Sequence, residues 1–341
     1  MIYNDIGAQD HATASAVTDA LALHYPARQV TSTIAGSRLR SPPLISRRTP
    51  FFLGFWNVRS LKSTETQSLT IRTLSDYNVD IACLSEVRLP HSGRKTIPVP
   101  NSDTTYEMYW SGVSDNSGLH GVAFALSRKA HASLLEWEPI SSRLARIRLR
   151  GSVFNITIFC VYAPTNDASD ATKDEFYGTL QVHKSRVPTS DMLIFAGDWN
   201  ARPGHNDEYS RPYLGNYSIG DQCSNGARML DFAMSNQLVV SSSRFRHPDR
   251  HLITWYSNDG VTKAQLDHVL VRARWASCVL DCRAYRGAET GSEFGSDHVL
   301  VRAKLRLRLR ARPSNAKPIM IDVEQLKNDS IRNDFRLKLH N

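Results

Sequence analysis

The stretch MLIFAGDWN, residues 192–200, passes directly from five apolar residues into a polar ending. A short apolar run of this kind is typical of a strand that is buried on both faces of a sheet. Asp198 and Asn200 are two residues apart, so in an extended chain their side chains point to the same side. The stretch therefore predicts a buried strand that delivers a carboxylate and an amide to a cleft. A plain turn, in which Asp and Asn are both common, is the alternative.

Polar residues border other apolar runs in the same manner. They are Asn57 after residues 51–55, Glu86 after residues 81–84, Tyr162 after residues 154–161, and Asp297 with His298 at the start of the last strand. Hydrolysis of a phosphodiester needs carboxylates for a hard metal ion, amides that hold oxygen atoms, and groups that move or donate a proton. Because these borders supply all of these groups, we expect them to meet at one cleft.

The order of the predicted elements indicates an α/β protein. Helices are expected at residues 65–77, 173–187 and 227–237, the last after Asn225 as its N-cap. About a dozen strands are too many for one open sheet, so we expect two packed sheets flanked by helices. The expected strands are residues 51–58, 81–85, 108–111, 122–127, 144–149, 156–162, 192–196, 238–241, 252–255, 266–271, 279–285 and 298–307.

The two ends of the chain differ in composition and in apolar periodicity from residues 51–310, which we expect to form the folded domain. Residues 1–50 are rich in Ala, Ser, Thr and Arg without periodicity, and prolines interrupt them, so a tail is expected there. Residues 311–341 turn polar. We expect a connector in that segment, with a short helix at residues 323–337.

The chain carries a net charge of +9, and its pI is about 9.4. A basic balance suits a polyanionic partner but does not bear on the fold. Part of the charge lies on strands that alternate cationic with apolar residues, at residues 146–150 and 302–312. An ordinary solvated strand face is the alternative for either strand.

The five cysteines are odd in number and have no metal-knuckle spacing, which favours a reducing, intracellular location. Cys83 and Cys160 lie within apolar runs and are expected to be buried thiols. No apolar stretch is long enough to cross a bilayer, so no membrane contact is expected.

Glu86 ends a run that is typical of a fully buried strand. A carboxylate in such a place is costly unless it is paired or binds a metal ion. Mg²⁺ is typically held by few protein carboxylates, together with waters and substrate phosphate. We therefore expect Glu86 to hold Mg²⁺, with Asn57 supporting Glu86 or a metal-bound water. Pairing of Glu86 with Arg88 or Arg59 is the alternative.

Asp267 lies inside an apolar strand, and His298 lies at the mouth of another. A buried Asp that accepts a hydrogen bond from a histidine fixes its tautomer and stabilises the imidazolium. We expect such a pair here, with His298 as base or transition-state stabiliser and water as nucleophile; a purely structural pair is the alternative. His268 is a rival partner, but strand alternation places it on the face opposite Asp267.

Tyr162 stands at the end of its strand, which Pro164 closes. Its phenol is expected to donate a hydrogen bond to a phosphate oxygen or to the leaving group. The alternative is a core tyrosine whose hydroxyl is satisfied within the protein.

Seven short motifs occur in an order and spacing that resembles the endonuclease/exonuclease/phosphatase superfamily over residues 51–310. Within it, the chain most resembles the apurinic-type endonuclease domain of LINE-like non-LTR retrotransposons, and residues 323–339 resemble the connector before reverse transcriptase. The seven motifs are Trp56-Asn57-Val58, Ser85-Glu86, residues 161–165, Gly197-Asp198-Trp199-Asn200, Thr254-Trp255, Leu266-Asp267-His268 and Gly295-Ser296-Asp297-His298. The closer likeness is carried by residues 57–61, 162–165, 285–287, 296–298 and 304–312.

The resemblance implies a four-layer αββα sandwich, DNase I-like, with the site at one end of the paired sheets. It implies Mg²⁺ or Mn²⁺ as cofactor, DNA as partner, and nicking of one strand to leave a 3′-hydroxyl and a 5′-phosphate. A monomer that acts in the nucleus is the matching expectation. The implied roles are metal binding by Glu86, Asn57 and Asp297, catalysis by Tyr162, Asp198, Asn200, Asp267 and His298, and phosphate or DNA contacts by Thr165 and Trp255.

The chain departs from repair-type members of that superfamily at Arg59, where they have Asp, and at Ser85, where Gln is usual. These departures weaken the interpretation as a repair enzyme. Two polar loops, residues 243–250 with Arg244 and Arg246, and residues 258–263, are candidates for reading DNA shape. Ordinary surface loops are the alternative.

Two other functions stay open at this point. One is another phosphoesterase of the same fold, such as a repair endonuclease, a deadenylase or a phosphoinositide phosphatase. The other is a catalytically inert remnant that binds nucleic acid. Cleavage of plasmid compared with that of an inositol phosphate separates the first of these from a DNA endonuclease.

Overall fold

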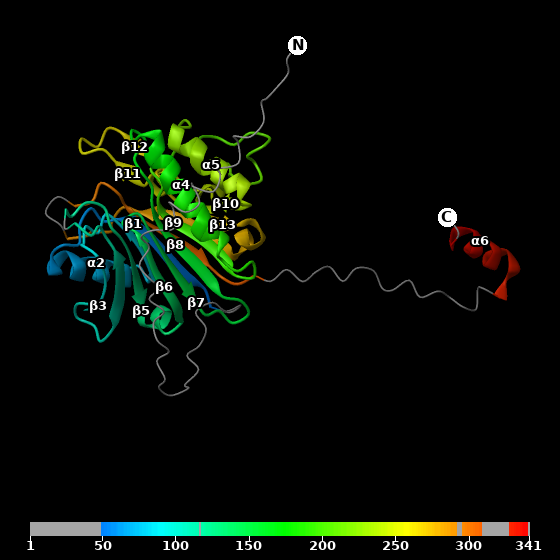
Figure 1. The fold of residues 1–341 in the computed structure, drawn as a ribbon, viewed down its shortest axis with the longest axis horizontal. Helices are drawn as coiled ribbons and strands as arrows, with labels where there is room; N and C mark the ends of the chain where they lie inside the picture. The colour runs from blue at the N-terminus through cyan, green and yellow to red at the C-terminus, as the bar shows by residue number, and fades with distance from the viewer. Residues whose placement is uncertain (1–48, 116, 292–294, 309–326, 340–341) are drawn as a thin grey trace, which may run out of the picture. The chain divides into compact units, whose positions relative to one another are not determined.

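The computed structural model describes residues 49–115, 117–291, 295–308 and 327–339, and the chain divides into two units before Arg308. In the first unit, two β-sheets pack face to face. Helix α2 (Thr64–Asp76) covers one sheet, and helices α4 (Asp170–Ser185) and α5 (Ser224–Ser235) cover the other (Figure 1). The predicted four-layer αββα sandwich is therefore confirmed. The predicted tail lies almost wholly outside the described residues, and the domain boundaries stay a prediction.

The seven-stranded sheet carries the first two polar strand ends. Its strand β1 runs parallel to β2 with Asn57 opposite Ser85, so Asn57 and Glu86 leave the sheet at the same edge. Across the sheet, the strands are β14 (Val279–Tyr285), β15 (Leu300–Leu305), β1 (Phe51–Asn57), β2 (Ile81–Ser85), β5 (Val122–Ser127), β4 (Thr105–Ser111) and β3 (Ser92–Pro98).

The six-stranded sheet carries three further polar strand ends. Strand β8 runs parallel to β9 with Tyr162 opposite Asp198, and β13 runs antiparallel to β9 with Asp267 opposite Asp198. These three side chains therefore start from one edge of the sheet. Across the sheet, the strands are β10 (Leu238–Val240), β13 (Asp267–Arg272), β9 (Met192–Asp198), β8 (Ile156–Tyr162), β7 (Leu144–Leu149) and β6 (Leu134–Ser141).

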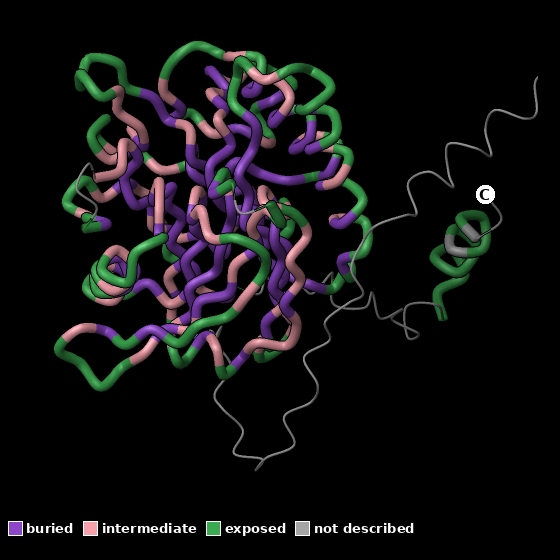
Figure 2. The backbone as a smooth tube through the Cα atoms, turned by 60° about the vertical axis from the view of Figure 1, so that its left-hand side comes forward, coloured by how far each residue is buried: buried purple, intermediate pink, exposed green. Residues whose placement is uncertain are grey.

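Strand β9 is buried along its whole length, as the apolar run predicts. The ring of Phe195 stacks on that of Phe159 with centroids 4.8 Å apart, and residues of α4 and α5 belong to the same core cluster. Figure 2 shows the same pattern, with burial concentrated in the strands and exposure in the loops. Full burial of one such side chain contributes about 1.5–3 kcal/mol, so the two packed faces hold β8 and β9 firmly in the middle of the molecule.

The main helices begin at residues that cap their free N–H groups. Ser63 and Ser169 cap α2 and α4 through their hydroxyl oxygens. The expected cap of α5 was Asn225, which is wrong, because Cys223 takes that position. Asn225 is instead buried in the first turn, where its amide donates to two carbonyl oxygens in the loops after β8 and β9. It thereby ties α5 to the polar strand ends.

The sequence does not predict strands β3 and β6, which lie at the outer edges of the two sheets. Strand β3 is mostly exposed and polar, and β6 contains Pro139, which edge strands tolerate. The strand predicted at residues 252–255 is wrong over most of its length, because only Trp255 of it pairs with another strand. The remaining short elements are β11 (Trp255–Tyr256), β12 (Lys263–Ala264), α3 (Arg128–His131), η1 (Ser241–Arg244), η2 (Asp249–His251) and η3 (Ala273–Cys278).

The second unit contains helix α6 (Asp329–Leu339). The helix expected at residues 323–337 is confirmed from residue 329 onward, and residues 323–326 lie outside the described part of the chain. Every residue of α6 whose burial is described is exposed.

The basic residues of β7 are ion-paired within the first unit. Arg146 contacts Glu138 at 2.5 Å, and Arg148 contacts Asp191 at 2.8 Å. On β15, Arg302 packs over two aromatic rings. Part of that second basic run lies outside the described residues. The charge on β7 is therefore matched by carboxylates of the protein itself.

The buried thiols are also confirmed. Cys83 and Cys160 are each at most 1% exposed, and all five cysteines are free. Within the described residues, no helix is both long and apolar enough to span a membrane.

Gly197 offers a direct test of the packing between β8 and β9. It has a φ of +144°, and a Cβ atom on it would lie 2.0 Å from the carbonyl oxygen of Val161. We expect Gly197→Ala to lower the free energy of unfolding by at least about 2 kcal/mol, because the neighbouring backbone cannot move away cheaply. Chemical denaturation measures this change.

Gly178 provides the matched control. It lies on the exposed face of α4, with nothing within 4 Å of the added methyl group. Gly178→Ala is expected to raise the free energy of unfolding by about 0.4–1 kcal/mol. Equal effects of the two substitutions would contradict tight packing at Gly197.

Candidate active site

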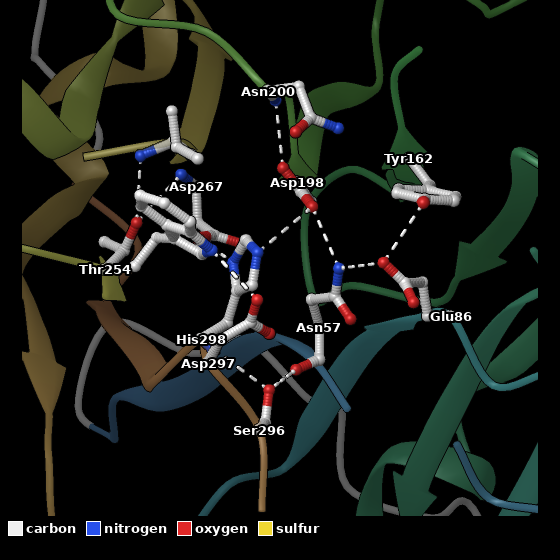
Figure 3. Close-up of polar contacts among 12 residues, drawn as sticks. Asn57, Glu86, Tyr162, Asp198, Asn200, Thr254, Asp267, Ser296, Asp297 and His298 are labelled. Atoms are coloured by element: carbon white, nitrogen blue, oxygen red, sulfur yellow. Dashed lines mark hydrogen bonds and ion pairs between the residues drawn. The ribbon is translucent and has the colours of Figure 1, made fainter. Parts of the chain in front are cut away.

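The polar strand ends of the two sheets meet at one edge of the sandwich (Figure 3). The amide nitrogen of Asn57 donates to Glu86 Oε1 at 2.9 Å and to Asp198 Oδ2 at 3.0 Å. Glu86 follows β2 of one sheet, and Asp198 ends β9 of the other. One side chain therefore links carboxylates that belong to different sheets.

Glu86 is surrounded by hydrogen-bond donors. Tyr162 donates to its Oε1 at 3.1 Å, and Arg88 contacts its Oε2 at 2.9 Å. Burial acts to raise the pKa of Glu86, but the hydrogen bonds from Asn57, Arg88 and Tyr162 outweigh it and lower the pKa. Glu86 is therefore an ionised carboxylate, as a metal ligand must be.

The backbone at Glu86 has a φ of +54°, in the left-handed region that a residue with a side chain rarely adopts. Asn200 shares this property with a φ of +46°. Such conformations cost of order 1–3 kcal/mol and persist where the surrounding structure holds them. At Glu86 the compensating contacts are the three donors around its carboxylate.

Asp198 is fully buried at the end of β9. Its Oδ1 accepts from the backbone nitrogen of Asn200 at 2.9 Å, and its Oδ2 lies 3.7 Å from Nε2 of His298. Burial raises the pKa of Asp198 to about 7. The side-chain amide of Asn200 donates to the carbonyl oxygen of Ala163 at 2.9 Å, which fixes the residue beside Asp198.

The predicted contact between Asp267 and His298 is confirmed, at 2.8 Å from Oδ2 to Nδ1. Thr254 holds this end of β13 by accepting from the backbone nitrogen of Asp267 at 3.1 Å. Burial by itself lowers the pKa of His298, but the carboxylates of Asp267 and Asp198 outweigh it and raise the pKa to about 10. His298 is therefore an imidazolium at neutral pH.

His268 faces the opposite side of β13, as alternation predicts. Its ring nitrogens contact Ser242 Oγ at 3.0 Å and the carbonyl oxygen of Ala201 at 2.9 Å. Burial lowers the pKa of His268. It is a neutral, hydrogen-bonded core residue.

Asp297 lies apart from Glu86 in its contacts. Trp255 donates to its Oδ2 at 3.0 Å, and Arg59 lies 3.7 Å from its Oδ1. Ser296 precedes Asp297 and donates from its hydroxyl group to the carbonyl oxygen of Asn57 at 2.6 Å. The segment that carries Asp297 and His298 is thus fastened to the end of β1.

Three predicted contact residues lie on the surface. Thr165 is exposed in the loop after β8, and Arg244 and Arg246 are exposed after β10. Their side chains make no hydrogen bond or ion pair with the residues that the structure describes. Their roles, like those of the whole predicted set, stay predictions.

Arg143 is a site residue that the sequence does not predict. Its guanidinium lies 4.7 Å from the ring centroid of Tyr162 and also contacts His120 at 3.2 Å. It comes from the turn between β6 and β7, far along the chain from Tyr162. No local motif marks this position, so only the pairing of β7 with β8 could have found it.

The donor set fits a hard divalent cation such as Mg²⁺, which prefers oxygen ligands. Asp198, Asp267 and His298 each offer a ligand atom within 4.8 Å of one another. His298 bonds to Asp267 through Nδ1, so only its Nε2 is available to an ion, and this nitrogen must lose its proton before it can bind one. The ionised carboxylate of Glu86, whose side chain is 20% exposed, also fits such an ion.

The charge of His298 links stability to pH. Its pKa of about 10 exceeds the ordinary 6.5, so its contribution to stability is fully present below about pH 6.5 and is lost as pH rises through 10. The comparison is made in EDTA and above about pH 7, where Asp198, whose pKa is about 7, has already lost its proton. In that range the wild type is expected to lose stability as the pH rises, and His298→Gln is expected to lose less. Denaturation midpoints measure this. The same pH dependence in both proteins would contradict a charged His298.

Known proteins share this sequence pattern. The profile of the Endonuclease/Exonuclease/phosphatase family matches residues 54–298. Craniofacial development protein 2 from Bos taurus is 31% identical over 275 residues, which are 81% of this chain and 44% of that relative. The chain therefore spans less than half the length of this curated relative.

Solved structures share the fold. The endonuclease domain of TRAS1, a telomere-specific non-LTR retrotransposon, has a TM-score of 0.50 and 15% identity, covering 76% of this chain and 100% of that one. The 3′ phosphatase NExo from Neisseria, bound to product DNA hairpin, has a TM-score of 0.53 and 19% identity, covering 75% of this chain and 100% of that one. Since the family profile covers most of the chain, the resemblance seen in the motifs is confirmed, and the chain belongs to the Endonuclease/Exonuclease/phosphatase family.

Proposed function

We propose that this chain is an Mg²⁺-dependent DNA endonuclease that nicks one strand and leaves a 3′-hydroxyl and a 5′-phosphate. The observation that carries the proposal is the pair of hydrogen bonds from Asn57 to Glu86 and Asp198, next to the contact between His298 and Asp267. A carboxylate for a metal ion, a buried carboxylate for water and a charged imidazole thus share one edge of the sandwich.

In this proposal Glu86 holds the ion, which supplies charge neutralisation at the scissile phosphate when it is bound. Asp198 orients the attacking water and accepts its proton. A pKa of about 7 suits this role, because a general base works best with a pKa near the operating pH.

His298 and Tyr162 act as hydrogen-bond donors. The imidazolium of His298, which Asp267 holds in position, faces the phosphate oxygens that gain negative charge in the transition state. Burial raises the pKa of Tyr162 well above its ordinary value. Its phenol therefore stays protonated and can donate to a phosphate oxygen or to the leaving group.

DNA as the substrate is supported by the net charge of +9. The similar fold of a retrotransposon endonuclease domain and of a phosphatase with bound DNA points the same way. Asp297, Thr165, Trp255, Arg244 and Arg246 remain candidates for contacts to the metal ion or to DNA. A monomer acting in the nucleus, derived from a non-LTR retrotransposon, is part of the same proposal.

A phosphatase is the second candidate, because NExo, a 3′ phosphatase, has the same fold. The same residues could hydrolyse a phosphomonoester. The two functions differ in substrate, since an endonuclease relaxes supercoiled plasmid and a phosphatase releases inorganic phosphate from a 3′-phosphate end or an inositol phosphate.

The direct test is nicking of supercoiled plasmid by the full chain. We expect nicking with Mg²⁺ that EDTA stops and that added Mg²⁺ restores. Glu86→Ala and His298→Ala are each expected to lower the rate by about 100-fold or more, because each removes a group that stabilises the transition state.

Matched controls come from exposed residues of the same kinds. Glu65→Ala, on the surface of α2, and His205→Ala, in the loop after β9, are expected to nick at the wild-type rate. A folded wild type that does not nick but releases phosphate would favour the phosphatase. Nicking that survives both Glu86→Ala and His298→Ala would place the chemistry elsewhere.

A further inference from the structure

A polar cleft of about 330 Å³ opens beside Asp297 and His298. Its walls are the turn of the β11–β12 hairpin, the chain after β14 and the chain before β15. Because Asp297 and His298 form part of the lining, the cleft adjoins the candidate active site. The proposed reaction leaves most of this cleft without a role.

One wall carries Arg286, an exposed residue after β14. Its guanidinium lies 4.5 Å from the ring centroid of Tyr256, which is on the hairpin. Arg286 forms no ion pair with the described residues. Stacking on the ring orients the planar guanidinium, and its N–H groups make no hydrogen bond with the residues that the structure describes.

The other wall carries a charge pair. Arg59 lies 3.7 Å from Asp297, whose second oxygen accepts from Trp255. The carboxylate of Asp297 is thus matched within the wall itself. Among the described lining residues, Arg286 adds a positive charge that no second carboxylate matches, and Ser257 and Asn258 add neutral polar groups at the hairpin turn. An anion is the ligand that this lining suits.

We propose that the cleft binds a backbone phosphate of the strand being cut, next to the scissile phosphate, with Arg286 as its cationic partner. This inference rests on the proposed function, in which His298 faces the scissile phosphate. It assigns the substrate class, because a mononucleotide has no neighbouring backbone phosphate to place there. The site therefore selects a polynucleotide.

The test uses the full chain and a short fluorescent DNA duplex in EDTA, so that binding is measured without cleavage. Fluorescence anisotropy over a series of salt concentrations gives the Kd and the slope of log K against log salt. Arg286→Ala is expected to weaken binding by about tenfold. It should also reduce the size of the slope by about 0.9, because one phosphate contact is lost. Arg286→Lys, which keeps the charge, should restore most of the slope.

Arg274 is the matched control. It also stacks on an aromatic ring, 4.7 Å from the centroid of Trp275, but it follows β13 at the end opposite Asp267. Arg274→Ala is expected to leave both Kd and slope unchanged. Equal slopes in wild type and Arg286→Ala, or an equal loss in Arg274→Ala, would overturn the assignment. If the wild type nicks DNA and Arg286→Ala keeps the wild-type salt slope, only the assignment of the cleft is wrong. If the wild type neither binds nor nicks DNA, the proposed function is wrong as well.

Discussion

The amide of Asn57 is the interaction on which the site depends. Its nitrogen donates to Glu86 on its own sheet and to Asp198 on the facing sheet. Burial disfavours the charged form of both carboxylates, and the hydrogen bond from Asn57 favours it at each of them. One donor thus joins the ends of the two sheets and acts on both carboxylates.

The packing of the two sheets offsets the free-energy cost of this arrangement. Glu86 and Asn200 hold left-handed backbone conformations that cost free energy, and Asp198 is ionisable yet fully buried. The apolar strands behind them supply the compensating stability, and Ser296 and Thr254 fasten the segments that carry His298 and Asp267. A network in which nearly every member is bonded is more rigid than its separate pairs, and this rigidity holds the residues of the candidate site in a fixed geometry.

Much of the fold and of the candidate site could be predicted from the sequence, because apolar runs mark buried strands and their polar borders mark the edge where strands end. Alternation along β13 was enough to choose His298 over His268 as the partner of Asp267. The edge strand β3 was missed because its exposed face gives no apolar pattern. Contacts such as that of Trp255 with Asp297 join distant segments, so no local pattern could reveal them.

The position of the metal ion distinguishes a site at Glu86 from a site at the buried cluster around His298. Asp198, Asp267 and His298 form the alternative cluster, with ligand atoms within 4.8 Å of one another. Anomalous diffraction from a crystal of the protein with Mn²⁺ would locate the ion directly. We expect an ion bonded to Glu86, with the hydrogen bond between Asp267 and His298 intact. An ion bonded to His298 and Asp267, with none at Glu86, would contradict a charged His298 and the mechanism built on it.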